Sequence, residues 1–177
     1  MPHPKLKQVG VVDVNFGNNV TVVQPANLYG CTICDDVFVG PFTEIQKGVK
    51  IGARTKVQSH SFVCELVEIG EDCFIGHGVM FTNDVFVNGG PAKGDKSLWR
   101  TTRIGNRVSI GSNASLLPVE ICDDVVIGAG AVVTRDIVVS GTYAGNPARL
   151  LKSNRVSTGL IGASRTAHFP SCKNHNE

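Results

Sequence analysis

The feature that most constrains the fold of this chain is an apolar residue at every sixth position. Nine consecutive sixth positions are apolar: Ile33, Val39, Ile45, Ile51, Val57, Val63, Ile69, Ile75 and Phe81. The frame resumes downstream at Ile104, Ile110, Leu116, Ile121, Ile127 and Val133. A period of six fits neither the 3.6-residue turn of an α-helix nor the simple alternation of a strand. It predicts an all-β parallel β-helix of hexapeptide repeats, in which three repeats make one triangular coil.

Glycine often follows the apolar position, and we expect it to permit the sharp turn between two sides of the coil. Aromatic residues make up only 6% of the chain and glycine accounts for 20 residues, which is typical of a core built from small repeated units. A β-sandwich of short strands would not keep a strict six-residue phase over this length.

Two interruptions of the repeat mark departures from the regular coil. Leu116 and Ile121 are five residues apart, which predicts a shortened corner. Phe81 and Ile104 are 23 residues apart, where three hexapeptides would take 18, so we expect about five residues and one side to leave the coil. The resulting loop, about residues 84–102, is rich in turn-forming residues and carries the only tryptophan. A long loop on a regular scaffold is a frequent place for function.

The length and charge of the chain bound its organisation. The 177 residues suit one β-helix domain over 1–151, followed by a non-repeat tail over 152–177 that is a helix, an arm or disordered. The net charge of +2 gives no electrostatic indication that the chain binds nucleic acid. No apolar run is long enough for a membrane span, and the first residues lack the apolar core of a signal peptide, so we expect a cytoplasmic protein. We expect its cysteines to be reduced and structural, without a metal.

Several segments resemble the hexapeptide acyltransferases, which use acetyl-CoA and assemble as homotrimers with active sites between subunits. The general resemblance lies in Ile127-Gly128-Ala129-Gly130-Ala131-Val132-Val133 with the later Gly145-Asn146-Pro147-Ala148-Arg149. It implies that the β-helix is left-handed. More narrowly, Gln58-Ser59-His60-Ser61-Phe62-Val63-Cys64-Glu65, Gly76-His77-Gly78-Val79-Met80-Phe81-Thr82-Asn83-Asp84 and Ser97-Leu98-Trp99-Arg100 resemble nucleotide-linked amino-sugar N-acetyltransferases.

That narrower resemblance implies acetyl transfer to the 3-amino group of a UDP-2-acetamido-3-amino-2,3-dideoxy-glucuronate, for bacterial surface polysaccharide such as O-antigen. A sister branch acts on dTDP-3-amino-3,6-dideoxyhexoses, and the sequence leaves the two open. An O-acetyltransferase with a histidine base is the strongest rival. Two other classes fit the sequence less well. A zinc-dependent γ-type carbonic anhydrase would need two histidines five residues apart, and a non-catalytic β-helix would have no use for a long loop.

Spacing points to a group of candidate catalytic residues at the root of the loop. Glu65 and Asn83 are 18 residues apart, so we expect them to face outward from one corner on adjacent coils, about 5 Å apart. Asp84 follows where the loop departs, and His60 lies on an outward turn one coil earlier. Our interpretation is that Asn83, with Asp84, aligns the amine, that the leaving CoA thiolate takes the proton, and that His60 is the fallback base. The resemblance adds Glu65 and Arg100 as substrate-binding residues.

The resemblance also implies which residues bind CoA. Ser112 and Ala129 would hold the pantetheine arm through their backbone, and the five-residue corner at Leu116 is expected to restore the stacking of this pair, which are 17 residues apart. Arg135 and Arg149, with Thr134, would meet the phosphates of the cofactor.

Overall fold

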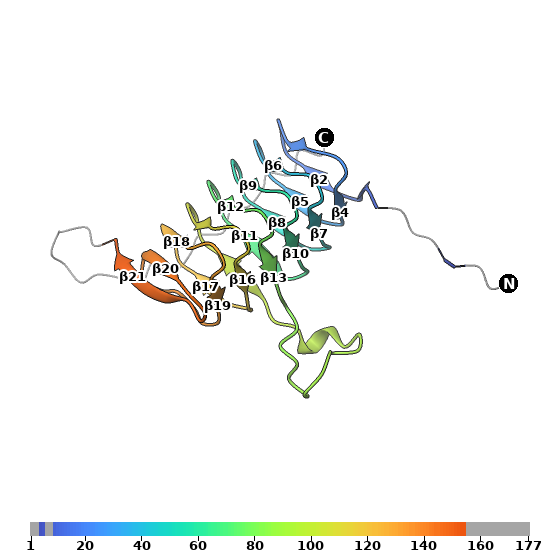
Figure 1. The fold of residues 1–177 in the computed structure, drawn as a ribbon. Helices are drawn as coiled ribbons and strands as arrows, with labels where there is room; N and C mark the ends of the chain where they lie inside the picture. The colour runs from blue at the N-terminus through green and yellow to red at the C-terminus, as the bar shows by residue number, and fades with distance from the viewer. Residues whose placement is uncertain (1–3, 6–8, 155–177) are drawn as a thin grey trace.

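The chain winds into a triangular β-helix in a computed structural model that describes residues 4–5 and 9–154 (Figure 1). Sheet A, in spatial order, contains β1 (Val11–Val12), β4 (Asn27–Tyr29), β7 (Glu44–Ile45), β10 (Phe62–Val63), β13 (Met80–Phe81), β16 (Ser115–Leu116) and β19 (Val132–Val133). Sheet B contains β2 (Asn15–Phe16), β5 (Thr32–Ile33), β8 (Lys50–Ile51), β11 (Val67–Ile69), β14 (Thr102–Ile104) and β17 (Glu120–Ile121). Sheet C contains β3 (Thr21–Val22), β6 (Phe38–Val39), β9 (Lys56–Val57), β12 (Phe74–Ile75), β15 (Ser109–Ile110), β18 (Val125–Ile127), β20 (Gly141–Ala144) and β21 (Arg149–Ser153). Neighbouring strands are parallel except for β20 and β21, which pair antiparallel.

The period-six residues form the core, as the sequence predicts. Ile33, Val39, Ile45 and Ile51 have no exposed surface. Register confirms the 18-residue coil, because Ile33 pairs with Ile51 and Val39 pairs with Val57. The shortened corner after Leu116 is also confirmed, since Leu116 pairs with Val133, 17 residues away.

The glycines serve a different purpose from the predicted one. The turns place non-glycine residues in the left-handed region, for example Arg54 at φ 59° and His60 at φ 63°. A Cβ on Gly40 would lie 2.6 Å from the backbone nitrogen of Ser59, and one on Gly111 would lie 2.4 Å from that of Ala129. A glycine directly after the apolar position is therefore required by the close approach of the next coil and not by an unusual φ.

The long insertion leaves the coil at one corner without removing a side. The next side of the coil after Phe81 in sheet A lies in sheet B, where Ile104 pairs with Ile69 of the preceding coil. The expectation that one side of the coil is lost is therefore wrong, because residues 82–101 all lie in the connection between two consecutive sides. This loop projects from the solenoid and contains one short 3₁₀ helix, η1 (Lys96–Leu98) (Figure 1).

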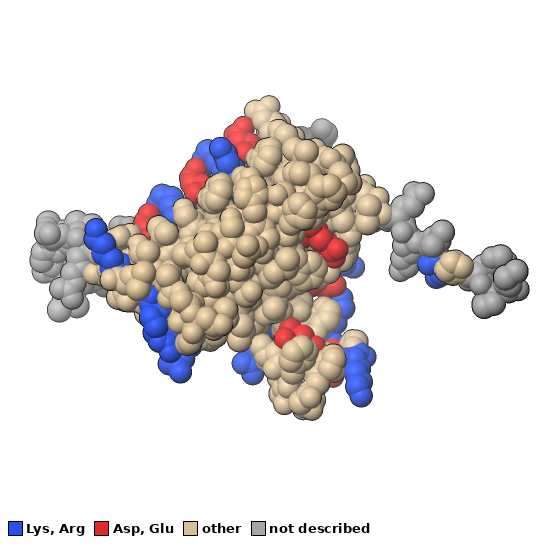
Figure 2. Space-filling model, in the orientation of Figure 1, with Lys and Arg blue, Asp and Glu red and all other residues tan. Residues whose placement is uncertain are grey.

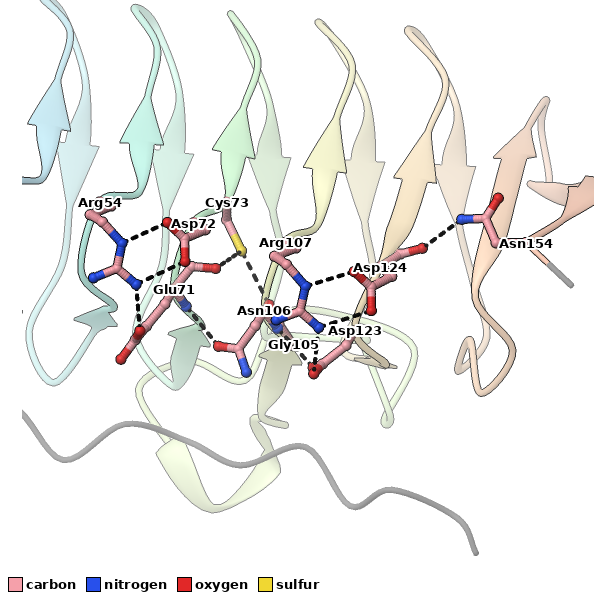
Figure 3. Close-up of polar contacts among 10 residues, drawn as sticks. All are labelled: Arg54, Glu71, Asp72, Cys73, Gly105, Asn106, Arg107, Asp123, Asp124 and Asn154. Atoms are coloured by element: carbon pink, nitrogen blue, oxygen red, sulfur yellow. Dashed lines mark hydrogen bonds and ion pairs between the residues drawn. The ribbon is translucent and has the colours of Figure 1, made fainter. Parts of the chain in front are cut away.

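The outer surface differs strongly from one part of the solenoid to another. Sheet B carries a row of alternating charges, in which Glu68 contacts both Lys50 and Arg103. The corner between sheets B and C carries a second row, in which Arg54 binds Asp72 at 2.7 Å and Arg107 binds Asp124 at 2.7 Å (Figure 3). Figure 2 shows red and blue side chains alternating along one edge of the molecule. Because these charges are already paired, this side is suited to solvent and not to an anionic ligand.

We expect the Arg54 pair to make a small, acid-sensitive contribution to stability. Hydrogen bonds from Arg54 lower the pKa of Asp72, so the stabilisation is present above the unfolded pKa and is lost as the pH falls through the folded value. Arg54→Met should lower Tm by about 2 °C at pH 7, because exposed pairs are weak. Lys56→Met, at an exposed lysine with no ion pair in the described part of the chain, is the control. A Tm difference that persists once the pH is below the folded-state pKa of Asp72 would contradict this account.

The cysteines differ from the expectation at one position. Cys31, Cys64, Cys73 and Cys122 carry free thiols, which confirms the prediction for these four. Cys34 is disulfide-bonded, contrary to the expectation of reduced cysteines. Within the described residues no helix is long and apolar enough to cross a membrane. The predicted tail lies outside the described residues from position 155 onward, and β21 extends the ordered strand to Ser153.

Candidate active site

Asn83 stands where the loop leaves the corner between sheets A and B. Its Nδ2 donates to the backbone carbonyl of Glu65 at 3.1 Å, which confirms that the two residues are neighbours on adjacent coils. Its own backbone carbonyl accepts from the N–H of Arg100 at 2.9 Å, where the loop returns. The Oδ1 of Asn83 has no donor among the described residues. The side chain is thus oriented by the scaffold and offers one free acceptor at the loop root.

Asp84 holds the loop and does not point a free carboxylate at a ligand. Its Oδ1 accepts from the N–H of Phe86 at 2.9 Å, and its Oδ2 accepts from the N–H of Ala92 at 2.7 Å. Both oxygens are used inside the loop. Asp84 therefore fixes the first part of the loop directly after Asn83, and its predicted role beside the amine stays a prediction.

Glu65 is paired with a residue of the loop that the sequence did not single out. Lys96 Nζ lies 2.6 Å from one carboxylate oxygen of Glu65 and 2.7 Å from the other. The same ammonium lies 5.1 Å from the ring centroid of Trp99. The Arg100 side chain is exposed and has no carboxylate partner within the described ranges. No spacing rule predicts a pair 31 residues apart across a loop, which is why Lys96 was missed.

His60 does not join this group within one chain. It lies on the corner between sheets C and A, where the centroid of its ring is 4.9 Å from that of Phe42 and the two rings are tilted by 32°. Strand β10 of sheet A separates that corner from Glu65. The prediction that His60 lies around the loop root is therefore wrong for a single chain, because the loop departs from the next corner of the triangle.

The predicted CoA residues Ser112 and Ala129 do stack on the corner between sheets C and A. The N–H of Gly130 donates to the carbonyl of Ser112 at 2.8 Å. The outward N–H groups of Ser112 and Ala129 have no acceptor among the residues that the structure describes. At the corner between sheets B and C some of the equivalent groups are satisfied by a side chain of the next coil, as where the backbone N–H of Asn106 donates to Asp123 Oδ1 at 2.9 Å. A row of free N–H donors beside small side chains can donate to the amide carbonyls of an extended chain.

The last coil forms a cleft that brings together Thr134, Arg135 and Arg149. It has a volume of about 170 Å³ and is also lined by Tyr143, whose hydroxyl donates to the carbonyl of Val139 at 2.8 Å. Neither arginine has a carboxylate partner among the described residues, in contrast to Arg54 and Arg107. Two guanidinium groups without a carboxylate partner at one cleft, of which that of Arg149 donates to the carbonyl of Ala148 at 3.1 Å, favour an anionic ligand such as a phosphate.

The cysteine next to the site is unsuited to covalent catalysis. Burial raises the pKa of Cys64 to about 12, so its thiol is almost entirely protonated at neutral pH and does not supply a nucleophilic thiolate. No group of three His, Cys, Asp or Glu side chains in the described ranges is placed to hold a metal ion.

Comparisons with known proteins agree with this architecture. Residues 30–65 match the bacterial transferase hexapeptide (six repeats) family, and residues 101–135 match the hexapeptide repeat of succinyl-transferase. The chain is 30% identical over 69% of its length to the bifunctional protein GlmU of Bdellovibrio bacteriovorus, of which it covers 24%. It thus spans only about a quarter of that curated relative.

Two solved structures have the same fold. AntD, an N-acyltransferase from Bacillus cereus solved with dTDP and coenzyme A, superimposes with a TM-score of 0.67 at 19% identity, covering 80% of this chain and 84% of AntD. A galactoside acetyltransferase in complex with coenzyme A gives a TM-score of 0.58 at 27% identity, covering 71% of this chain and 66% of the other. At 19% identity the likeness to AntD establishes the fold alone.

Proposed function

We propose that this protein is an acetyl-CoA-dependent N-acetyltransferase that acts on the amino group of a nucleotide-linked sugar. The observation that carries the proposal is the oriented side chain of Asn83, whose free Oδ1 stands at the root of the only long loop among the described residues. The free N–H row of Ser112 and Ala129 and the arginine-lined cleft support a CoA site on the same solenoid. The likeness to acyltransferases solved with coenzyme A agrees with it.

The proposed reaction needs orientation more than a strong base. The neutral sugar amine attacks the thioester carbonyl, a C–N bond forms, and the C–S bond breaks to release the CoA thiolate. Asn83 Oδ1 accepts one N–H of the amine and aims its lone pair at the carbonyl. The amine proton passes to the leaving thiolate, so the products are the acetamido sugar and CoA thiol.

The site requires two copies of the chain. Asn83 lies at the corner between sheets A and B, whereas Ser112 and Ala129 lie at the corner between sheets C and A, so one side of the prism separates the acceptor from CoA. In a homotrimer with sheet A facing the three-fold axis, the corner between sheets A and B of one copy meets the corner between sheets C and A of the next copy. The outward row of sheet A includes Phe62 and Met80, in contrast to the charged row of sheet B. His60 of a neighbouring copy then approaches Asn83, which keeps it as the fallback base.

Within this proposal the reaction takes place in the cytoplasm, and the acceptor is a UDP-linked 3-amino-glucuronate that is later used for surface polysaccharide. A dTDP-3-amino-3,6-dideoxyhexose is the alternative acceptor. Incubation with acetyl-CoA and each sugar, while free thiol is followed, tests both. Thiol release with a 3-amino sugar nucleotide supports the proposal. Release with neither sugar, but with a hydroxyl acceptor, would replace it with an O-acetyltransferase.

The cleft arginines give a prediction for CoA. Arg135→Ala and Arg149→Ala should each raise the KM for acetyl-CoA about tenfold with little change in kcat, because each removes one charge-assisted contact to a phosphate. Arg107→Ala, whose guanidinium is paired with Asp124, is the matched control and should leave that KM unchanged. Equal effects of all three substitutions would show that the cleft does not bind the cofactor.

A further inference from the structure

The ion pair at the loop root places a primary ammonium group on the carboxylate of Glu65, the residue whose backbone accepts from Asn83. Lys96 Nζ contacts both carboxylate oxygens of Glu65, at 2.6 and 2.7 Å. The backbone carbonyl of the same Glu65 accepts from Asn83 Nδ2. A single residue therefore links the lysine ammonium to the side chain proposed to align the substrate amine.

The two partners of this pair are held very differently. The Glu65 side chain is 20% exposed, and its backbone N–H donates to Gln46 Oε1 at 3.2 Å, so the carboxylate belongs to the coil. The Lys96 side chain is 58% exposed and comes from the loop. Exposed lysine–carboxylate pairs are weak and exchange partners readily. The lysine is the partner that can be replaced.

We propose that the Glu65 carboxylate and Asn83 Oδ1 form a site for a primary ammonium group: in the free protein the carboxylate is paired with Lys96, and the protonated amine of the acceptor displaces this lysine. This inference rests on the proposed function and adds how that site selects its acceptor. A sugar amine reaches the enzyme mostly as R–NH₃⁺, the same head group as Lys96. It loses one proton to solvent and then attacks as R–NH₂, so the net reaction releases one proton with the CoA thiol. A hydroxyl acceptor carries no charge with which to displace Lys96, so the site favours amines.

Kinetics on two loop lysines test the displacement. Lys96→Met removes the internal competitor and should lower the KM for the 3-amino sugar nucleotide about threefold with kcat unchanged, since more of the enzyme is ready to bind. Lys93→Met, at an exposed loop lysine without an ion pair in the described part of the chain, is the matched control and should change neither constant. Glu65→Gln should raise the KM about tenfold because the ammonium loses its counter-charge. A raised KM or a lowered kcat for Lys96→Met would overturn the inference and show that the lysine supports the structure of the loop.

A binding experiment without turnover separates this inference from the proposed function. Trypsin cleavage after Lys96, normalised to cleavage after Lys93 in the same chain, should rise several-fold with methylammonium and not with tetramethylammonium, which has the charge but no N–H donor. Equal responses to the two cations would overturn the ammonium site even if the enzyme acetylates sugars. A selective response to methylammonium would support the site even if no sugar nucleotide is turned over, in which case the proposed function alone fails.

Discussion

Asn83→Ala should lower kcat/KM for the amino-sugar nucleotide about 30- to 150-fold, equivalent to roughly 2–3 kcal/mol of transition-state binding. The variant removes the free Oδ1 that receives the amine and leaves the carbonyl of Glu65 without its side-chain donor. Thiol-release kinetics measure the loss, and circular dichroism confirms that the β-helix is retained. Asn83→Asp is the companion variant, because it keeps an acceptor oxygen but loses the donor to Glu65.

His60→Ala distinguishes the two chemistries available to this fold. If the CoA thiolate takes the proton, His60→Ala is damaged less than Asn83→Ala, because an amine needs no strong base. An O-acetyltransferase would show the reverse order, since a hydroxyl gains about 10²- to 10⁴-fold from a positioned base. A more severe loss in His60→Ala would therefore replace the mechanism proposed for Asn83 with a histidine-base mechanism.

Ala129→Trp should reduce kcat/KM for acetyl-CoA about 100-fold or more. Ala129 is exposed beside the free N–H row, and an indole there fills the path proposed for the pantetheine arm. Ala53→Trp is the matched control, because Ala53 follows Ile51-Gly52 at the corner between sheets B and C as Ala129 follows Ile127-Gly128. Comparable losses in the two variants would mean that the groove is not the cofactor path.

The fold was predictable because one physical rule is repeated along the chain. Each sixth residue must be apolar to fill the interior, so the positions of Ile33 to Phe81 define core, side and coil together. Two details did not follow from that rule. The glycines are required by close contacts with the next coil, as at Gly40 and Gly111, and these contacts can be recognised only once the coils are stacked. The loop was counted against a full coil of 18 residues, although it interrupts a single corner.

The site was predictable only where the repeat fixes positions. Spacing by whole coils placed Asn83 beside Glu65 and Ser112 beside Ala129. Spacing did not predict the position of His60 correctly. A residue three positions after an inward residue lies at the corner that ends its own side of the coil, and for His60 this is the corner between sheets C and A. The loop obeys no repeat, so the contacts of Asp84 with Ala92 and of Lys96 with Glu65 depend on tertiary structure alone.

The most direct test of the account mixes two inactive variants. Asn83→Ala and Ala129→Trp, co-expressed with different tags and purified as mixed trimers, place an intact Asn83 corner of one copy against an intact Ala129 corner of the next once in each mixed trimer. One intact site of the three in each purified mixed trimer predicts recovery of about a third of the wild-type acetyl transfer. Mixed trimers that are no more active than either parent would contradict the account and place acceptor and cofactor on a single chain.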